Sequence, residues 1–178
     1  MVSAAPPMLK HMSSHESGLQ ALDSRMLLRQ YAETLTILVE RGVVRSRNAP
    51  AGDLAETLVA QAYGGRLAPP SQKSWDIELL DGTTLQVKCR VIDPQGRRSQ
   101  VYSPFRSWDF DRCVFVLLDI TSYDVMSGVE VPATSLRSPA RRSEWVAGDR
   151  ISLSTDLSSL EGARDVTESL SAAMGALE

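Results

Sequence analysis

Cysteine, histidine and aromatic residues are scarce in this sequence, and long apolar runs are missing from it. The chain of 178 residues contains two cysteines and two histidines, and Phe, Trp and Tyr make up 6% of it. Cys89 and Cys113 form no closely spaced pair, so neither a zinc site nor a disulfide scaffold is expected, and both are interpreted as buried free thiols. No apolar run approaches the roughly 20 residues that cross a membrane, so we expect no membrane role.

Several catalytic signatures are also missing. The sequence contains no Ser-His-Asp set, no glycine-rich phosphate loop and no zinc-ligand spacing, which argues against acyl hydrolases, nucleotide-dependent motors and zinc enzymes. Residues 1–24 begin with a stretch rich in Pro and Ser, for which we expect a flexible tail. This stretch lacks the apolar segment of a secretory signal, so the expected location is cytoplasmic. Residues 25–178 are long enough to bury the core of a single domain.

Charge is unevenly distributed along the chain. The net charge is −3, but residues 41–112 carry more Lys and Arg than Asp and Glu, whereas Arg164 is the only basic residue of 151–178. A basic middle beside an acidic end is typical of a local surface for an anionic ligand. Ordinary scatter of solvated charge is the alternative.

Two helices are predicted before the first strand. Apolar residues recur at helical spacing over residues 27–41, and Gly42 follows as a C-terminal glycine. A second helix is predicted over residues 54–63, with Asp53 as its N-cap and Gly64 at its end.

Strands dominate the rest of the chain. An Asp-Gly hairpin is predicted first, and the continuous apolar run that follows it has the pattern of a central strand buried on both faces. The order of elements predicts an α/β domain with a mixed sheet and helices on its faces. The expected elements are the hairpin over 74–91, strands over 111–120, 123–132 and 149–155, and an amphipathic helix over 160–177.

The hairpin carries polar side chains at alternate positions. Gln86 and Lys88 share one face of the second strand, and the first strand carries Asp76. A two-residue Asp-Gly turn would mismatch the apolar and polar rows of the two strands. A three-residue loop over 80–82, with Gly82 left-handed in a bulge, places Asp76 opposite Gln86. The pattern therefore favours the bulged loop.

The grouped side chains suit phosphodiester chemistry. A hard cation such as Mg²⁺ prefers oxygen ligands, which the Asp76 carboxylate, the Gln86 amide and the backbone carbonyl of Val87 can supply. Such a cation activates water, and Lys88 could position that water and offset phosphate charge. The alternative is that these are solvated polar residues of an ordinary hairpin.

The motif resembles that of a known superfamily. Asp76, ten residues before "QVK", is similar to the signature of the PD-(D/E)XK nucleases, the restriction endonuclease-like superfamily, in a variant with Gln86 at the second acidic position (D-x9-QxK). Trp75 replaces the usual Pro. The resemblance covers roughly residues 25–155, and the run over 41–90 looks like small bacterial proteins thought to be nucleases of this kind.

The resemblance implies a fold, an activity and a further site residue. It implies a mixed sheet flanked by helices in an αβββαβ-type core, here with an extra N-terminal helix. It also implies a Mg²⁺-dependent DNA endonuclease for which Mn²⁺ can substitute. Glu56 matches the acidic residue that the superfamily often contributes from the helix before the hairpin. Because Glu56 also lies three residues after Asp53, a capping box is the alternative.

Basic residues indicate where DNA would bind. Arg side chains hold phosphates and read guanine, and Asn reads adenine, whereas the low aromatic content offers little for stacking single strands. Duplex DNA is the expected partner, and a homodimer would supply the paired sites that two-strand cleavage commonly uses. The alternative function is an inactive DNA-binding or protein-interaction module. The expected DNA contacts are Arg45, Arg47, Asn48, Lys73, Arg90, Arg97, Arg98 and Arg106.

Overall fold

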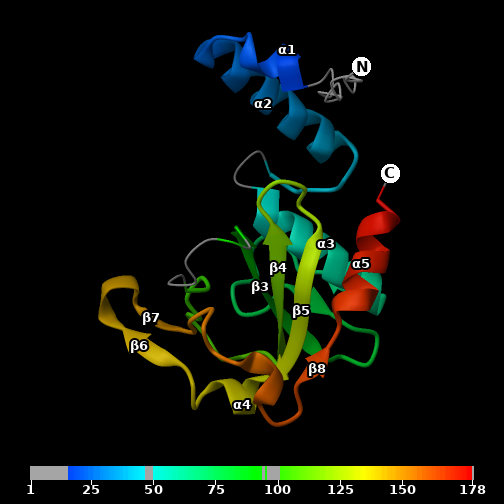
Figure 1. The fold of residues 1–178 in the computed structure, drawn as a ribbon. Coiled ribbons are helices and arrows are strands. Elements are labelled where there is room, and N and C mark those ends of the chain that lie inside the picture. Colours follow the sequence, from blue (N-terminus) through cyan, green and yellow to red (C-terminus); the bar gives the residue numbers. More distant parts are fainter. Residues whose placement is uncertain (1–15, 47–49, 94, 96–100, 178) are drawn as a thin grey trace, which may run out of the picture.

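A six-stranded mixed sheet forms the centre of the protein, with β4 among its inner strands (Figure 1). The computed structural model describes residues 16–46, 50–93, 95 and 101–177. The strand order is β1-β2-β3-β4-β5-β8, in which β3 and β4 are parallel and all other neighbours are antiparallel. The strands are β1 (Arg66–Leu67), β2 (Ile77–Glu78), β3 (Thr84–Ile92), β4 (Arg112–Asp119), β5 (Val125–Pro132) and β8 (Arg164–Asp165).

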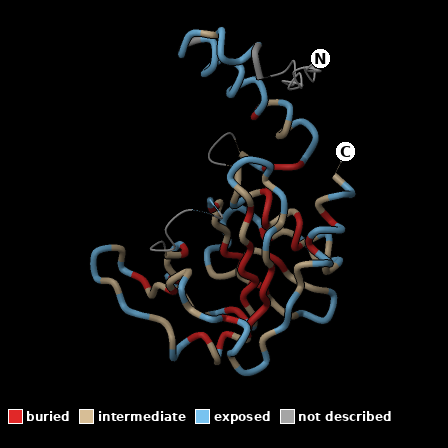
Figure 2. The backbone as a smooth tube through the Cα atoms, in the orientation of Figure 1, coloured by how far each residue is buried: buried red, intermediate tan, exposed pale blue. Residues whose placement is uncertain are grey.

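The predicted mixed α/β architecture is confirmed. The helices are α1 (Glu16–Gln20), α2 (Ser24–Glu40), α3 (Pro50–Tyr63), α4 (Ala133–Leu136) and α5 (Thr167–Gly175). The apolar run over 111–120 forms the predicted central strand, and four consecutive residues of β4 are buried. Figure 2 shows that buried residues concentrate along these inner strands. Among the described residues, no helix is both long and apolar enough to cross a membrane.

Two apolar clusters cover the two faces of the sheet. On one face, α3 and α5 pack against Leu85 and Val87 of β3 and Val114 of β4. The opposite cluster contains Phe105 and Phe115 and is covered by loop segments and the short helix α4. Alternate residues of β3 therefore point into different surroundings, as its period of two requires.

The connection from β3 to β4 differs from the αβββαβ pattern. That pattern places a helix between the third and fourth strands, but the described residues of 93–111 contain no helix. The second helix that packs on the sheet is α5, which comes after all the strands of the sheet. Phe105 and Phe110, from the connection itself, fill the face that a crossover helix would otherwise cover.

Several predicted elements have different bounds or partners in the structure. The strand expected over 149–155 is replaced by β7 (Gly148–Arg150), which pairs with β6 (Arg141–Ser143) in a separate hairpin and is bridged to Phe105 through Asp149. The closing helix begins at Thr167 because residues 164–165 join the main sheet as β8. Residues 16–20, within the segment expected to be a tail, form α1.

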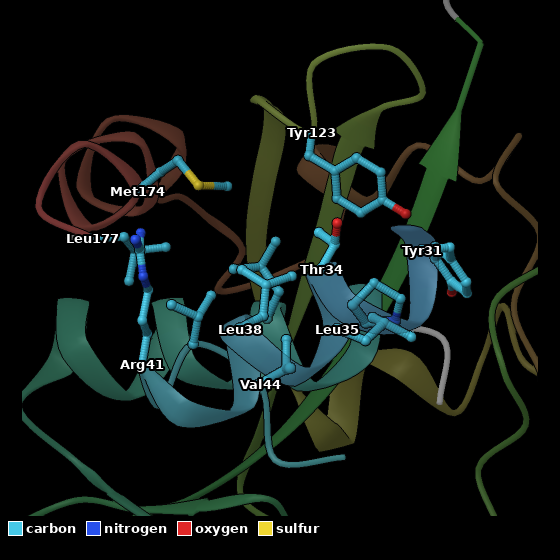
Figure 3. A pocket seen from close by; sticks show the side chains of 12 residues that line it. Tyr31, Thr34, Leu35, Leu38, Arg41, Val44, Tyr123, Met174 and Leu177 are labelled. Atoms are coloured by element: carbon cyan, nitrogen blue, oxygen red, sulfur yellow. The ribbon is translucent and has the colours of Figure 1, made fainter. Parts of the chain in front are cut away.

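Helix α2 carries an apolar stripe that the rest of the protein covers only near its C-terminal end. Leu35 is 4% exposed and Leu38 packs on the core, whereas Leu28 is 67% exposed. Figure 3 shows an apolar groove between α2, Tyr123 and the end of α5. The volume of this groove is about 460 Å³. The helix ends before Gly42, whose φ of +71° gives the predicted left-handed turn.

Candidate active site

The site is built where β2 separates from β3. The predicted register is confirmed, because Ile77 pairs with Leu85 and Gly82 has the left-handed φ of +85°. The strand expected from residue 74 is limited to Ile77–Glu78, and Trp75 packs into the opposite apolar cluster. The chain therefore leaves the sheet at Asp76, and within the described part of the chain β3 beyond Leu85 has no strand beside it on that edge.

The side chain of Asp76 takes the place of the missing strand neighbour. Its Oδ2 accepts the backbone N–H of Val87 at 2.7 Å and a hydrogen bond from Nε2 of Gln86. One backbone donor and one side-chain donor on β3 therefore hold this carboxylate at the free edge. The predicted meeting of Asp76 and Gln86 is confirmed.

The backbone carbonyl of Val87 points toward the same edge. Thr84 directs its carbonyl oxygen at the β4 side, where it accepts the N–H of Asp111 at 3.0 Å, whereas the Leu85 carbonyl accepts the N–H of Asp76 at 2.8 Å. Carbonyl directions alternate along a strand, so Val87 shares the direction of Leu85. Its oxygen is therefore available at the edge where Asp76 lies.

Glu56 approaches this edge from helix α3. The helix begins at Pro50, four residues before the predicted start at residue 54, so the prediction of Asp53 as N-cap is wrong. The Oδ2 of Asp53 instead accepts the backbone N–H of Arg45 at 3.0 Å. Glu56 lies in the second turn of the helix, which excludes the capping-box interpretation, and its carboxylate pairs with the Arg45 guanidinium.

Helix α3 is also anchored at its C-terminal end. The hydroxyl of Tyr63 donates to the buried carboxylate of Glu130 on β5, which also pairs with Arg112 on β4. These bonds fix the helix axis across the sheet, and with it the position of Glu56.

The carboxyl groups of Glu56 and Asp76 lie in a partly dehydrated environment. Burial, followed by the charge of Asp76, raises the pKa of Glu56 to about 7, although Arg45 acts in the opposite direction. Burial also raises the pKa of Asp76, despite its hydrogen bond from Val87. Two neighbouring carboxyl groups with raised pKa values are a common property of sites that bind a cation or transfer protons.

Lys88 is buried on the face of β3 opposite the α3 helix. It is 7% exposed, and its Nζ lies 4.7 Å from the centre of the Phe105 ring and 3.5 Å from the carbonyl oxygen of Pro104. Burial lowers the pKa of Lys88, and the charges of Asp76 and Glu56 partly oppose this shift. A buried ammonium with so few partners is costly, which is unusual for a residue that only supports the fold.

The predicted site residues line one pocket of about 350 Å³. Glu56, Asp76, Gln86, Val87 and Lys88 were predicted to act together, and the structure brings all five to this pocket. The sequence analysis missed three further lining residues. They are Gly52, Cys89 and Ser103, and no sequence pattern marks them because they come from three separate segments.

The predicted DNA contacts have several different surroundings. Arg45 is bound to Glu56 and to the carbonyl of Ala68 at 3.2 Å, and the Nε of Arg90 donates to the carbonyl of Val101 at 2.7 Å. Lys73 and Arg106 are exposed. The positive charge of Arg106 is close enough to contribute to lowering the pKa of Lys88. The four others, Arg47, Asn48, Arg97 and Arg98, lie outside the described residues.

The donor atoms of the pocket fit a hard divalent cation. Asp76 and Glu56 offer carboxylate oxygens, Gln86 an amide oxygen and Val87 a carbonyl oxygen, which are the donors that Mg²⁺ binds. Across the described residues, no group of three or more His, Cys, Asp or Glu side chains is placed to hold a metal ion. Amide and carbonyl oxygens would therefore have to complete the ligand set.

The two cysteines are free thiols in the structure. Cys113 is buried and Cys89 is half-buried, and burial raises the pKa of Cys89 to about 12. A thiol with this pKa stays protonated near neutral pH, so Cys89 lines the pocket as an apolar side chain.

No protein-family model matches this sequence, and a search of curated proteins also found no match.

Proposed function

We propose that this protein is a divalent-cation-dependent DNA endonuclease of the restriction endonuclease-like PD-(D/E)XK type. One observation carries the proposal: Asp76, Gln86, Lys88 and Glu56, from three elements of the fold, meet in one pocket at the open edge of β3. The antiparallel series β1-β2-β3 after α3, followed by the parallel strand β4, supports the strand arrangement of an αβββαβ-type core, although the described residues between β3 and β4 contain no crossover helix.

The residues of the pocket have distinct roles in this proposal. Asp76, Glu56, Gln86 and the Val87 carbonyl would hold Mg²⁺ or Mn²⁺, which when bound polarises a phosphodiester oxygen and lowers the pKa of water. Lys88, whose pKa burial lowers, positions the attacking water and offsets the charge that develops on the phosphate.

Arg45 and Glu56 form a pair that the cation would change. The Arg45 guanidinium supplies the positive charge beside Glu56. If Glu56 helped to hold a cation, Arg45 would no longer be needed to balance that carboxylate and could contact a phosphate of the substrate. Arg45 therefore acts as a positioning residue for Glu56 and as a DNA contact.

The test is cleavage of duplex DNA in the presence of Mg²⁺ or Mn²⁺. Lys88→Met removes the amine and keeps most of the side-chain volume, so cleavage should fall by about 10² or more. Arg29→Met, which removes a positive charge from an exposed position of α2, is the control and should leave the turnover rate unchanged. Equal turnover of the Lys88→Met variant and the unmodified protein would contradict the assigned mechanism.

A catalytically inactive DNA-binding or protein-interaction module on the same fold is the second candidate. One observation favours it: Asp76 is bound by Gln86 and Val87, and Glu56 by Arg45, so the carboxylates have partners without a cation. Binding of duplex DNA with no cleavage in either cation, and no stabilisation by them, would establish this alternative.

A further inference from the structure

A second charged pocket lies beside the β6–β7 hairpin, which projects from the body of the protein (Figure 1). The volume of this pocket is about 490 Å³. Three arginines line it, and its lining residues include no carboxylate. We call it the arginine pocket. Its lining residues include Val101, Arg141, Arg142, Arg150, Ser152 and Thr155.

The positive charge of this pocket is incompletely neutralised. Arg142 has an ion-pair partner in Asp149, whose Oδ1 lies 3.8 Å away, and Asp149 also accepts a hydrogen bond from Trp108. Arg141 donates to the backbone carbonyls of Ser138 and Ala140 at 2.9 and 3.1 Å. Among the described residues, Asp149 is therefore the one carboxylate that forms an ion pair with these three arginines.

Arg150 is the least satisfied member of the group. Its Nε is buried, and within the described part of the chain this atom has no hydrogen-bond partner. A buried guanidinium N–H without an acceptor is costly, and such groups are normally satisfied by a ligand or by water. Arg150 therefore lines the pocket with a guanidinium group that keeps one N–H without an acceptor among the described residues.

The chemistry of the lining fits a phosphate group. Guanidinium groups bind phosphate through paired N–H donors, and the hydroxyls of Ser152 and Thr155 can donate to further phosphate oxygens. The β6–β7 pairing places Arg141 directly opposite Arg150, so two of the guanidinium groups come from paired positions of one hairpin. A tetrahedral anion with several acceptor oxygens matches this set of donors.

One segment contributes a residue to the arginine pocket and another to the active-site pocket. Val101 lines the arginine pocket and Ser103 lines the active-site pocket, and Val101 forms an antiparallel β-bridge with Ser152. The carbonyl of Val101 also accepts the Nε of Arg90 from β3. Val101 and Ser103 are two residues apart, which in an extended chain is about 7 Å. Successive phosphates of one DNA strand advance about 3.4 Å along the duplex axis, so this length corresponds to about two nucleotides.

We propose that the arginine pocket is a phosphate-binding site that holds a backbone phosphate of the DNA a few nucleotides from the bond that is cut. This assignment rests on the proposed function, because the polymer that supplies the phosphate is the proposed substrate. The pocket fixes the position of the strand relative to Lys88 and Asp76, and it reads no base.

The first test measures duplex DNA binding by fluorescence anisotropy in EDTA, over a series of salt concentrations. In Arg150→Gln and Arg141→Gln, loss of one phosphate contact should weaken binding several-fold and reduce the slope of log K against log salt by about 1. Arg150→Lys, which retains the charge, should keep most of the slope. Arg29→Gln, on the exposed face of α2, removes the same charge elsewhere and is the matched control.

Equal losses in Arg150→Gln and Arg29→Gln, or an unchanged slope in both hairpin variants, would overturn the site. The melting temperature of each variant shows whether the variant still folds, so loss of binding can be told from loss of folding. Arg150→Lys keeps the positive charge and most of the aliphatic side chain, so it should also keep the fold.

The second test uses inorganic phosphate and no DNA. Titration should shift the backbone amide NMR signals of Val101, Arg150 and Ser152 in the unmodified protein and not in Arg150→Gln. Absence of these shifts would overturn the phosphate site. Phosphate binding here without any DNA binding would instead overturn the proposed function and the DNA assignment, so the two failures are distinguishable.

Discussion

The carboxylate of Asp76 accepts the backbone N–H of Val87 at 2.7 Å and so occupies the place of a strand residue beside β3. In Asp76→Asn the side-chain oxygen can still accept this N–H, so stability should change by no more than about 1 kcal/mol. The lost charge should reduce cleavage at least a hundredfold and abolish any rise in melting temperature caused by Mg²⁺. Asp81→Asn, the same change in the exposed turn, should retain both properties.

Glu56 should make the stability of the protein depend on pH. Its folded pKa of about 7 exceeds the ordinary 4.5, so the stabilising contribution of the neutral form is present below pH 4.5 and is lost as pH rises through 7. Each pKa unit corresponds to about 1.4 kcal/mol, so the loss is up to roughly 3 kcal/mol. Glu56→Gln should abolish most of this loss.

Urea unfolding at pH 4.5 and pH 8, without divalent cations, measures the effect of Glu56. Glu33→Gln, at an exposed position of α2, should follow the unmodified protein. A pH profile for Glu56→Gln that matches the unmodified protein would exclude Glu56 as the titrating group. Excess Mg²⁺ at pH 8 should stabilise the unmodified protein more than Glu56→Gln, because the cation binds the ionised carboxylate.

Lys88 should lower stability while it supports activity. Burial lowers its pKa, so the folded protein binds this proton less tightly than the unfolded chain, and stability near pH 7 is reduced relative to higher pH. Lys88→Met should therefore unfold at a higher urea concentration at pH 7, although it loses cleavage. A less stable Lys88→Met variant would indicate that the lysine serves mainly to support the fold.

The hairpin turn depends on the left-handed conformation of Gly82. Its φ of +85° is unfavourable for any residue with a Cβ, so Gly82→Ala should destabilise the protein by about 1–2 kcal/mol. Gly52→Ala, in α3, has open space around the added Cβ and should be neutral or stabilising by up to about 1 kcal/mol. Thermal or urea unfolding of the two variants compares them directly.

Truncation of a side chain on the covered part of α2 should reduce the stability of the protein more than truncation on its uncovered part. Leu35 is buried in the core, so Leu35→Ala should cost about 2–4 kcal/mol of unfolding free energy. Leu28 lies on the same helix but is largely exposed, and Leu28→Ala should change stability by less than about 0.5 kcal/mol. Similar losses for both variants would show that a contact absent from this structure covers Leu28.

The central strands and the hairpin register were predictable from local patterns. The alternation of Gln86 and Lys88 with apolar residues, together with Gly82, leaves one register that buries the apolar row. The continuous apolar run of β4 likewise indicates a strand buried on both faces. The bounds of α3 were less predictable, because Asp53 has the chemistry of a cap but binds the backbone of Arg45 instead.

The sequence alone therefore determined which side chains β3 carries and that Asp76 lies opposite Gln86, because both follow from a period of two and one turn. Only the tertiary structure decided the surroundings of those side chains. Arg45 reaches Glu56 and Phe105 lies beneath Lys88 through contacts between segments distant in sequence. Burial and pKa depend on such contacts, which no local pattern specifies, and this is why the charge states of the site emerge only from the folded chain.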